Sequence, residues 1–243
     1  MGLFDWFRRK PATGKDSLQV PTIRESRIVQ PPLFEEPAAP VAPVEAVKDK
    51  AMSPATPQRR LVTKEQIAAG MGIPVARADI YDDWLNETMV LYRIDNRNRM
   101  AAFLAQLAVE SGGLRWFKEI WGNTRAQLRY EGRRDLGNTV KGDGKRFMGR
   151  GAIQLTGRAN YRKVTQWIRK VVKDAPDFEA NPHLLELPRW GCLAAGAFWD
   201  WNNINSLADK QAFTAVSKRV NGGYNGLAER KKYWARFLKI LSV

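Results

Sequence analysis

Cysteine and histidine are almost absent from this chain of 243 residues, which contains one of each. The single cysteine, Cys192, allows no intramolecular disulfide, and its apolar surroundings (GCLAAGAFW) predict a buried small hydrophobe. The usual zinc peptidases and amidases need two or three histidine ligands, whereas this chain offers only His183, which the segment NPHLLELP places at a solvated helix start. We therefore expect no metal site, no cofactor and no thiol chemistry.

Long apolar runs are also missing. No stretch of 18 apolar residues exists, so no transmembrane helix is predicted. The N-terminus lacks the apolar core of a secretory signal. If the substrate lies outside the cytoplasm, we expect another factor to carry the protein to it.

Acidic residues are in the minority. Forty Lys and Arg stand against 25 Asp and Glu, a net charge of +15, and residues 61–243 hold 30 of the basic and 18 of the acidic residues. This charge favours a polyanion, whether nucleic acid, anionic lipid or an anionic cell envelope. Nucleic acid is not the expected partner, because the basic residues are spread over several segments and no recognised nucleic-acid-binding motif is present.

Proline is concentrated at the start of the chain, where residues 1–60 hold nine of the 13. Proline at this density blocks helix and sheet, so we expect residues 1–60 to be a disordered tether. Its first ten residues, MGLFDWFRRK, have the composition of a short amphipathic helix that docks on a membrane or a partner, although a sticky terminus without a role fits equally well. The folded domain is predicted to span residues 61–243.

The domain has the apolar spacing of helices throughout. Thr63 and Gln66 form a plausible capping box, and further helices are predicted at about 80–92, 98–110, 160–173, 191–201, 211–220 and 227–241. Residues 122–151 contain seven glycines and are predicted to be a long loop, partly hairpin-forming. The expected fold is one mainly α-helical domain.

Two carboxylates are the candidate chemistry. Glu110 ends an apolar helix at Gly112–Gly113, and Glu119 follows nine residues later. Partial burial would raise the pKa of Glu110 and keep it protonated, as a general acid requires, while Glu119 would handle water. Spacing alone also fits two solvated surface glutamates.

The sequence motifs around Glu110 and Glu119 favour a catalytic pair over two surface glutamates. The stretches FLAQLAVESGGL, LGNTVKGDGKRFMGRGAIQLTGRANY and RVNGGYNGLAERKKYW occur in this order, and over residues 62–240 the chain resembles glycoside hydrolase family 19, within it the phage endolysin and chitinase-like branch. The resemblance implies a lysozyme-like helical fold with a long active-site loop. It also implies hydrolysis of β-1,4 bonds in polymers of N-acetylhexosamines, with inversion.

The resemblance also implies roles for single residues. Glu110 matches the general acid of the family, Glu119 the general base, and Thr156 the hydroxyl residue that helps to hold the attacking water. The family usually has histidine before the acid, and Val109 stands there in this chain. An apolar neighbour still favours a protonated Glu110. Glu131 is the rival for the base, although its arginine-rich surroundings favour a structural pairing with arginine.

Substrate-contacting positions are implied as well. Such positions are matched by Gln154 and Asn160 in the motif IQLTGRANY and by Asn221 in the motif NGG. Arg230 matches an arginine that stabilises the cleft through its charge. Arg150, in the motif GRG, fits a role in substrate binding and a role in bracing the loop equally well.

The substrate is left open between chitin and peptidoglycan. A strongly basic domain suits an anionic bacterial envelope, so we expect a peptidoglycan-degrading lysozyme that acts as an endolysin or within a virion. It would stay in the host cytoplasm until release to the cell wall, or be attached to a virion or inner membrane through residues 1–60. The alternatives are a chitinase, and a non-catalytic glycan-binding or virion structural protein on the same fold.

Overall fold

The computed structural model describes residues 59–242, and these residues are mainly helical, as predicted. The expected tether and its amphipathic tip lie outside the described residues, apart from Arg59 and Arg60. The helices are α1 (Lys64–Met71), α2 (Val75–Asp79), α3 (Asp82–Leu91), α4 (Arg97–Glu110), α5 (Arg125–Leu128), α6 (Asp143–Arg146), α7 (Arg158–Arg169), α8 (Pro188–Trp201), α9 (Ile204–Asp209), α10 (Phe213–Asn221) and α11 (Leu227–Ile240), with 3₁₀ helices η3 (Arg134–Leu136) and η4 (Pro182–Glu186). No helix among them is long and apolar enough to cross a bilayer.

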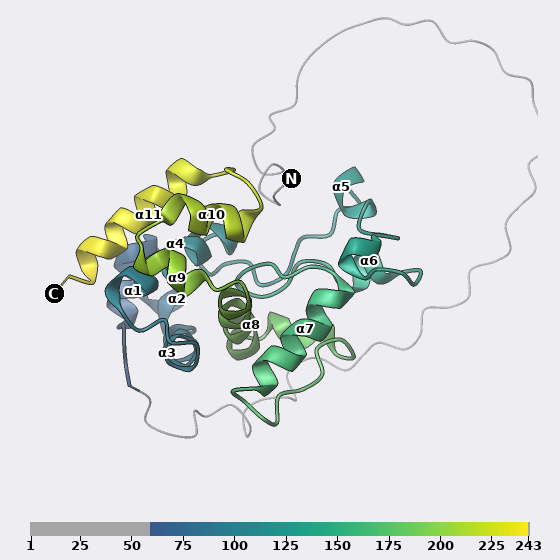
Figure 1. The fold of residues 1–243 in the computed structure, drawn as a ribbon, viewed down its shortest axis with the longest axis horizontal. Helices are drawn as coiled ribbons and strands as arrows, with labels where there is room; N and C mark the ends of the chain where they lie inside the picture. Colours follow the sequence, from purple (N-terminus) through teal and green to yellow (C-terminus); the bar gives the residue numbers. More distant parts are fainter. Residues whose placement is uncertain (1–58, 243) are drawn as a thin grey trace, which may run out of the picture. The chain divides into compact units, whose positions relative to one another are not determined.

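Helix α4 is the centre of the fold. The Asn96 side chain caps its N-terminus by accepting a hydrogen bond from the Arg99 amide at 3.0 Å, and every residue from Met100 to Glu110 is buried. It packs against α1, α9, α10 and α11, which surround it in Figure 1. A helix enclosed in this way holds the side chains at its C-terminus in fixed positions.

Helix α8 forms a second centre, packed against α3, α7, α9 and η4. An edge-to-face contact between Trp199 and Phe103, with ring centroids 5.2 Å apart, joins α8 to α4. Gly196 allows the Tyr92 ring to come so close that a Cβ atom would lie 2.3 Å from it. Cys192 is fully buried in this helix, as predicted, and burial raises the pKa of its thiol.

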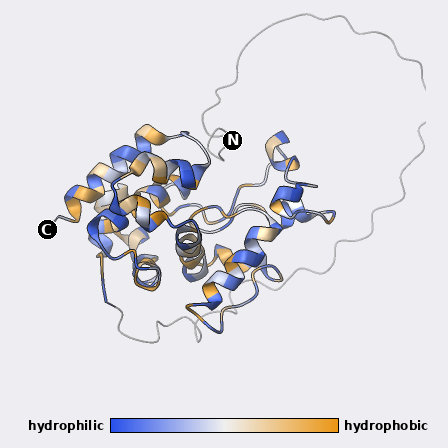
Figure 2. Cartoon of the chain, in the orientation of Figure 1, coloured by the Kyte–Doolittle hydropathy of each residue, from blue (hydrophilic) through white to orange (hydrophobic). Residues whose placement is uncertain are grey.

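The basic loop, residues 122–150, has a different construction. It contains only the short helices α5, α6 and η3, and in this part of the described chain no hydrophobic side chain is buried between Lys118 and Arg146. Its hairpin character is limited to two isolated bridges, which pair Arg150 with Lys118 and with Leu155. Figure 1 shows α6 near the start of α7 and α5 on the far side of α6, and in Figure 2 the loop is largely blue, whereas α8 and α11 carry both colours.

The helices expected from the sequence are confirmed, including the reciprocal capping box of Thr63 and Gln66. Four short helices were missed: α2 and α9, and α5 and α6 within the predicted loop. Four to six residues are too short to show a helical period. Predicted boundaries differ from the observed ones by a few residues, as at α7, which begins at Arg158 rather than at residue 160.

Candidate active site

Glu110 is the last residue of α4 and is only 9% exposed. Its Oε1 accepts a hydrogen bond of 2.5 Å from Nη2 of Arg230, a residue of α11 that is 1% exposed. Nη1 of the same guanidinium donates to the side-chain oxygen of Gln106, one turn before Glu110 on α4. Burial raises the pKa of Glu110, and the charge and hydrogen bond of Arg230 act in the opposite direction. The carboxyl group can therefore hold a proton while staying oriented.

Asn221 joins this group through the chain between α10 and α11. Its Nδ2 and Nε of Arg230 both donate to the carbonyl of Asn225, at 3.3 and 3.4 Å. The structure thus connects Arg230 and Asn221 with Glu110. Gln106 was not found from the sequence, although its spacing of four residues from Glu110 places both polar side chains on one face of an apolar helix.

The chain between the two glutamates is tied into a tight turn at Ser111. Its Oγ donates to the Leu107 carbonyl at 2.6 Å and accepts from the Leu114 amide at 2.8 Å. The amides of Arg115 and Trp116 both donate to the Ser111 carbonyl, at 3.0 and 2.9 Å. This turn fixes the path from the end of α4 to the second carboxylate.

Glu119 is 8% exposed and binds two donors. Its Oε1 accepts from Nε2 of Gln127 at 3.0 Å, and its Oε2 accepts from the Gly149 amide at 2.9 Å. The Glu119 amide also donates to the Gly149 carbonyl at 2.8 Å. A carboxylate held by two donors from separate segments is fixed in orientation, as a general base must be.

Two further predicted residues meet Glu119 at Gly149. A Cβ atom on Gly149 would lie 3.0 Å from Oε1 of Gln154, 3.3 Å from Oε2 of Glu119 and 3.4 Å from Oγ1 of Thr156. Gln154 has a positive φ of 55°, and its Nε2 donates to the Trp116 carbonyl at 3.0 Å. The structure therefore places the predicted base, the predicted water-holding hydroxyl and a predicted substrate contact around one glycine.

Asn160 binds the backbone of the turn that carries Thr156. Its Nδ2 donates to the Thr156 carbonyl at 2.8 Å, across the start of α7. The Thr156 hydroxyl in turn donates to the Gln154 carbonyl at 3.1 Å. The described contacts thus give Asn160 a part in holding the turn that carries Thr156.

Two side chains left open by the sequence have structural contacts. Glu131 accepts hydrogen bonds from the amides of Gly142 and Gly144, at 2.6 and 2.9 Å, so the expected pairing with arginine is wrong. Backbone amides at the start of α6 attract the carboxylate instead. Arg150 is buried and binds Glu186 at 2.7 Å and the Tyr161 hydroxyl at 3.1 Å, which supports its role in bracing the loop.

Exposed apolar side chains flank the Glu119 group. Trp116, Ile120 and Leu128 are 39%, 46% and 56% exposed, and all lie within nine residues of Glu119 in the sequence. Large apolar side chains left exposed near polar groups are suited to binding a ligand. The apolar faces of sugar rings are a ligand that such a surface suits.

Similarity to known proteins shows the family of this chain. No protein-family model matches the chain. It is similar to a glycosyl hydrolase family 19 domain-containing protein of Haemophilus influenzae, with 31% identity over 166 residues that cover 57% of this chain and 78% of the relative. The chain belongs to glycoside hydrolase family 19. It is a glycosidase of the chitinase-like kind.

Plant and bacterial chitinases are more distant relatives. An Arabidopsis thaliana endochitinase is 29% identical over 154 residues, which cover 60% of this chain and 49% of that protein. Among solved structures, a bacterial family 19 chitinase matches with a TM-score of 0.58 and 20% identity over 75% of this chain and 96% of that one. Chitinase C of Streptomyces griseus matches with a TM-score of 0.55 and 20% identity over 76% and 78%. These structures confirm the lysozyme-like fold.

A substitution at Gly149 tests whether the close arrangement of Glu119, Gln154 and Thr156 is needed for catalysis. Gly149→Ala should lower kcat by about ten-fold or more, because the new Cβ would displace Gln154, Glu119 or Thr156 and small misplacements of reacting groups are costly. The φ of Gly149 is not positive, so alanine can adopt the backbone conformation without strain. The measurement is kcat on a soluble oligosaccharide together with thermal unfolding. Gly122→Ala is the control, because its nearest neighbour is 4.0 Å away.

Proposed function

We propose that this glycosidase degrades bacterial peptidoglycan, and that it acts as an endolysin or virion-associated lysozyme. The observation that supports peptidoglycan over chitin is the charge of the basic loop, which holds eight Lys and Arg against three Asp and Glu. The three acidic side chains are all engaged, by backbone amides or by arginine. Six exposed cations have no acidic partner among residues 59–242: Arg125, Arg129, Arg134, Lys141, Lys145 and Arg146.

Two of these cations lie close in the sequence to a side chain that binds the proposed base. Arg125 and Arg129 are each two residues from Gln127, the side chain that donates to Glu119. Chitin is a neutral polymer, so a positively charged surface does not strengthen its binding. Peptidoglycan carries carboxylates on its peptide stems, and a positively charged surface attracts them over a Debye length of about 8 Å at physiological salt.

The proposed mechanism is inverting and uses both glutamates. Protonated Glu110 gives its proton to the glycosidic oxygen as the bond to the anomeric carbon breaks. The carboxylate of Glu119 takes a proton from a water that attacks this carbon from the opposite face, with the Thr156 hydroxyl helping to hold the water. Gln154, Asn160 and Asn221 are proposed substrate contacts.

The test compares two polymers and two triple variants. Arg125→Gln/Arg129→Gln/Lys141→Gln should lower kcat/KM on purified peptidoglycan by about ten-fold, most strongly at low salt, and leave cleavage of neutral chitin oligomers unchanged. The control, Lys170→Gln/Lys173→Gln/Lys210→Gln, removes the same charge from exposed positions. Two of these lie beyond the C-terminus of α7, about 18 Å from its start at the basic loop.

The outcomes separate the candidate functions. Cleavage of chitin oligomers without release from peptidoglycan would replace the proposal with a chitinase. If the protein cleaved neither polymer, the glycan-binding or virion structural alternative would be favoured. Mass spectrometry of the new reducing ends separates a muramidase from a glucosaminidase.

The attachment to a virion or membrane concerns residues 1–60, which lie almost wholly outside the described residues. A truncation of this segment that alters neither localisation nor lysis would contradict it.

A further inference from the structure

The basic loop has no apolar anchor along most of its length. The side chains buried between Lys118 and Arg146 are all polar: Glu119, Gln127, Asn138 and Asp143. A segment with few buried apolar contacts opens easily unless polar contacts hold it. The loop nevertheless carries the two groups that bind the proposed base, so whatever fixes the loop also fixes the base.

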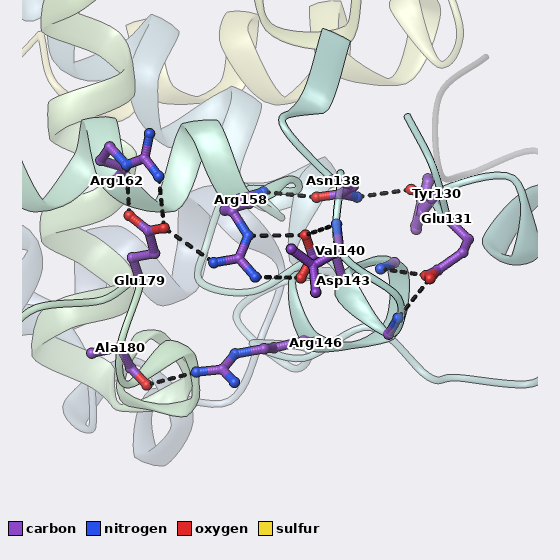
Figure 3. Close-up of polar contacts among 12 residues, drawn as sticks. Tyr130, Glu131, Asn138, Val140, Asp143, Arg146, Arg158, Arg162, Glu179 and Ala180 are labelled. Atoms are coloured by element: carbon purple, nitrogen blue, oxygen red, sulfur yellow. Dashed lines mark hydrogen bonds and ion pairs between the residues drawn. The ribbon is translucent and has the colours of Figure 1, made fainter. Parts of the chain in front are cut away.

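Arg158, the first residue of α7, is the main tie between the loop and the helical body. Its Nε and Nη2 form a fork on the carboxylate of Asp143, at 2.9 and 2.5 Å, and the Asp143 side chain is 2% exposed. Nη1 also lies 3.2 Å from the carboxylate of Glu179, in the chain that follows α7. Figure 3 shows the guanidinium between these two carboxylates. Forked pairs of this kind are strong and set direction as well as distance.

The backbone of Arg158 binds the loop a second time. Its amide donates to Oδ1 of Asn138 at 2.9 Å, and Nδ2 of Asn138 donates to the Tyr130 carbonyl at 2.9 Å (Figure 3). Asn138 is fully buried. A Cβ on Gly157 would lie 2.8 Å from Leu136, so the chain just before α7 also touches the loop directly. One residue therefore holds both the middle of the loop and the start of α6.

The two loop residues that bind Arg158, Asn138 and Asp143, lie in the sequence between the two groups that bind the Glu119 carboxylate. Tyr130 follows α5, whose Gln127 donates to Oε1 of Glu119, and Gly149, whose amide donates to Oε2, comes shortly after α6. Burial raises the pKa of the Tyr130 phenol, and the charge of Glu119 adds to the effect, as expected for neighbouring groups. The contacts of Arg158 thus lie between the two places where the loop binds the carboxylate.

We infer that Arg158 is a positioning residue, which fixes the basic loop against α7 and so orients the Glu119 carboxylate toward the attacking water. The inference rests on the proposed role of Glu119 as the base. Arg158 has no contact with Glu119 itself and acts through Asp143 and Asn138. Its effect should accordingly fall on the chemical step rather than on substrate binding.

Arg162 offers a matched control one turn further along α7. It forms a fork on Glu179 at 2.7 and 2.8 Å, so it shares a partner with Arg158, and it is part of the same view in Figure 3. Its side chain is 59% exposed, and among the described residues it makes no hydrogen bond to the loop. Removing it deletes an ion pair of the same chemistry without releasing Asp143.

The experiment measures kinetics and hydrogen exchange on the full chain. Arg158→Lys keeps the charge and the backbone bond to Asn138 but cannot form the fork. We expect kcat to fall about ten-fold with KM within about two-fold, and amide exchange to speed up in residues 120–149 but not in α4 or α8. Arg162→Gln should leave both properties near wild type, and Arg158→Gln should exceed the effect of Arg158→Lys.

Each other outcome counts against the inference. Wild-type kcat in Arg158→Lys, or unchanged exchange in the loop, would overturn it. Faster exchange in α4 and α8 as well as in the loop would show a merely structural role and would overturn it too. If the wild-type protein cleaves neither polymer, the proposed function fails. The exchange measurement then still tests whether Arg158 holds the loop.

Discussion

Replacing Glu110 with glutamine should lower kcat by a factor of about 10² to 10⁴, the usual contribution of a general acid or base. Glutamine has nearly the same shape and keeps an oxygen that can accept the hydrogen bond from Arg230, but it has no proton to give to the leaving oxygen. The stability should change less than the activity, because the amide oxygen still accepts the hydrogen bond from Arg230, although the buried guanidinium loses its opposite charge. Reducing ends released from peptidoglycan and thermal unfolding provide the two readouts.

The same change at Glu119 should behave differently. Both oxygens of this carboxylate accept hydrogen bonds, one from Gln127 and one from the Gly149 amide. A glutamine there must turn its NH₂ group toward one of these donors, which leaves a buried donor unpaired at a cost of about 1–3 kcal/mol. Glu119→Gln should therefore lose activity and stability together, whereas in Glu110→Gln the loss falls mainly on activity.

Glu229→Gln is the control for this pair, because Glu229 is exposed on α11 next to Arg230 and its loss removes the same charge. It should leave both activity and stability near wild type. Substantial activity in Glu110→Gln, within about ten-fold of wild type, would assign the proton donor to another residue.

The sequence predicted the position of Glu110 well because the relevant signals are local. An apolar stripe from Phe103 to Ala108 predicts a buried face, and Gly112–Gly113 ends the helix just beyond the glutamate. The structure has the same arrangement, with α4 ending at Glu110. Burial of the carboxyl group followed from this pattern without knowledge of the rest of the fold.

The partners of Glu119 could not be predicted in the same way. Gln127 forms a local capping box with Thr124, which the sequence spacing allows, but its hydrogen bond to Glu119 spans a turn of the loop. Gly149 reaches Glu119 from 30 residues away. No periodicity encodes such contacts, because they depend on how Arg158 and Asp143 fold the loop back onto α7.

The error at Glu131 has a related cause. Local composition, an arginine-rich stretch, predicted an arginine partner for this carboxylate. The loop instead turns the amides of Gly142 and Gly144 toward it, while Arg133 pairs with Asp135. Which partner a charged side chain takes depends on the path of the backbone, and composition says little about that path.

Removing Arg230 should have the largest effect on stability and should make that effect depend on pH. Arg230→Met leaves Glu110 buried without its cation, a kind of change that costs about 3–5 kcal/mol at neutral pH. The native pKa of Glu110 is already raised by burial, and loss of Arg230 removes the main opposing effect, so the pKa should rise further. A carboxyl with a raised native pKa binds more protons folded than unfolded, so stability falls as pH rises from its ordinary pKa to the raised one. The destabilisation should thus be much smaller near pH 4 than near pH 7.

The same shift should appear in the kinetics with a defined sign. Glu110 acts as an acid only while protonated, so activity falls as pH rises through its pKa. A higher pKa in Arg230→Met should move the alkaline limb of kcat/KM to higher pH, although the maximal rate drops because the carboxyl group loses its orienting partner. Lys232→Met removes a charge from an exposed position on the same helix and should shift neither curve. In Glu110→Gln/Arg230→Met the pH dependence of the destabilisation should disappear, because no titrating group remains at this end of α4. If the double variant kept that dependence, or if the alkaline limb moved to lower pH, the coupling between Arg230 and Glu110 would not be the cause.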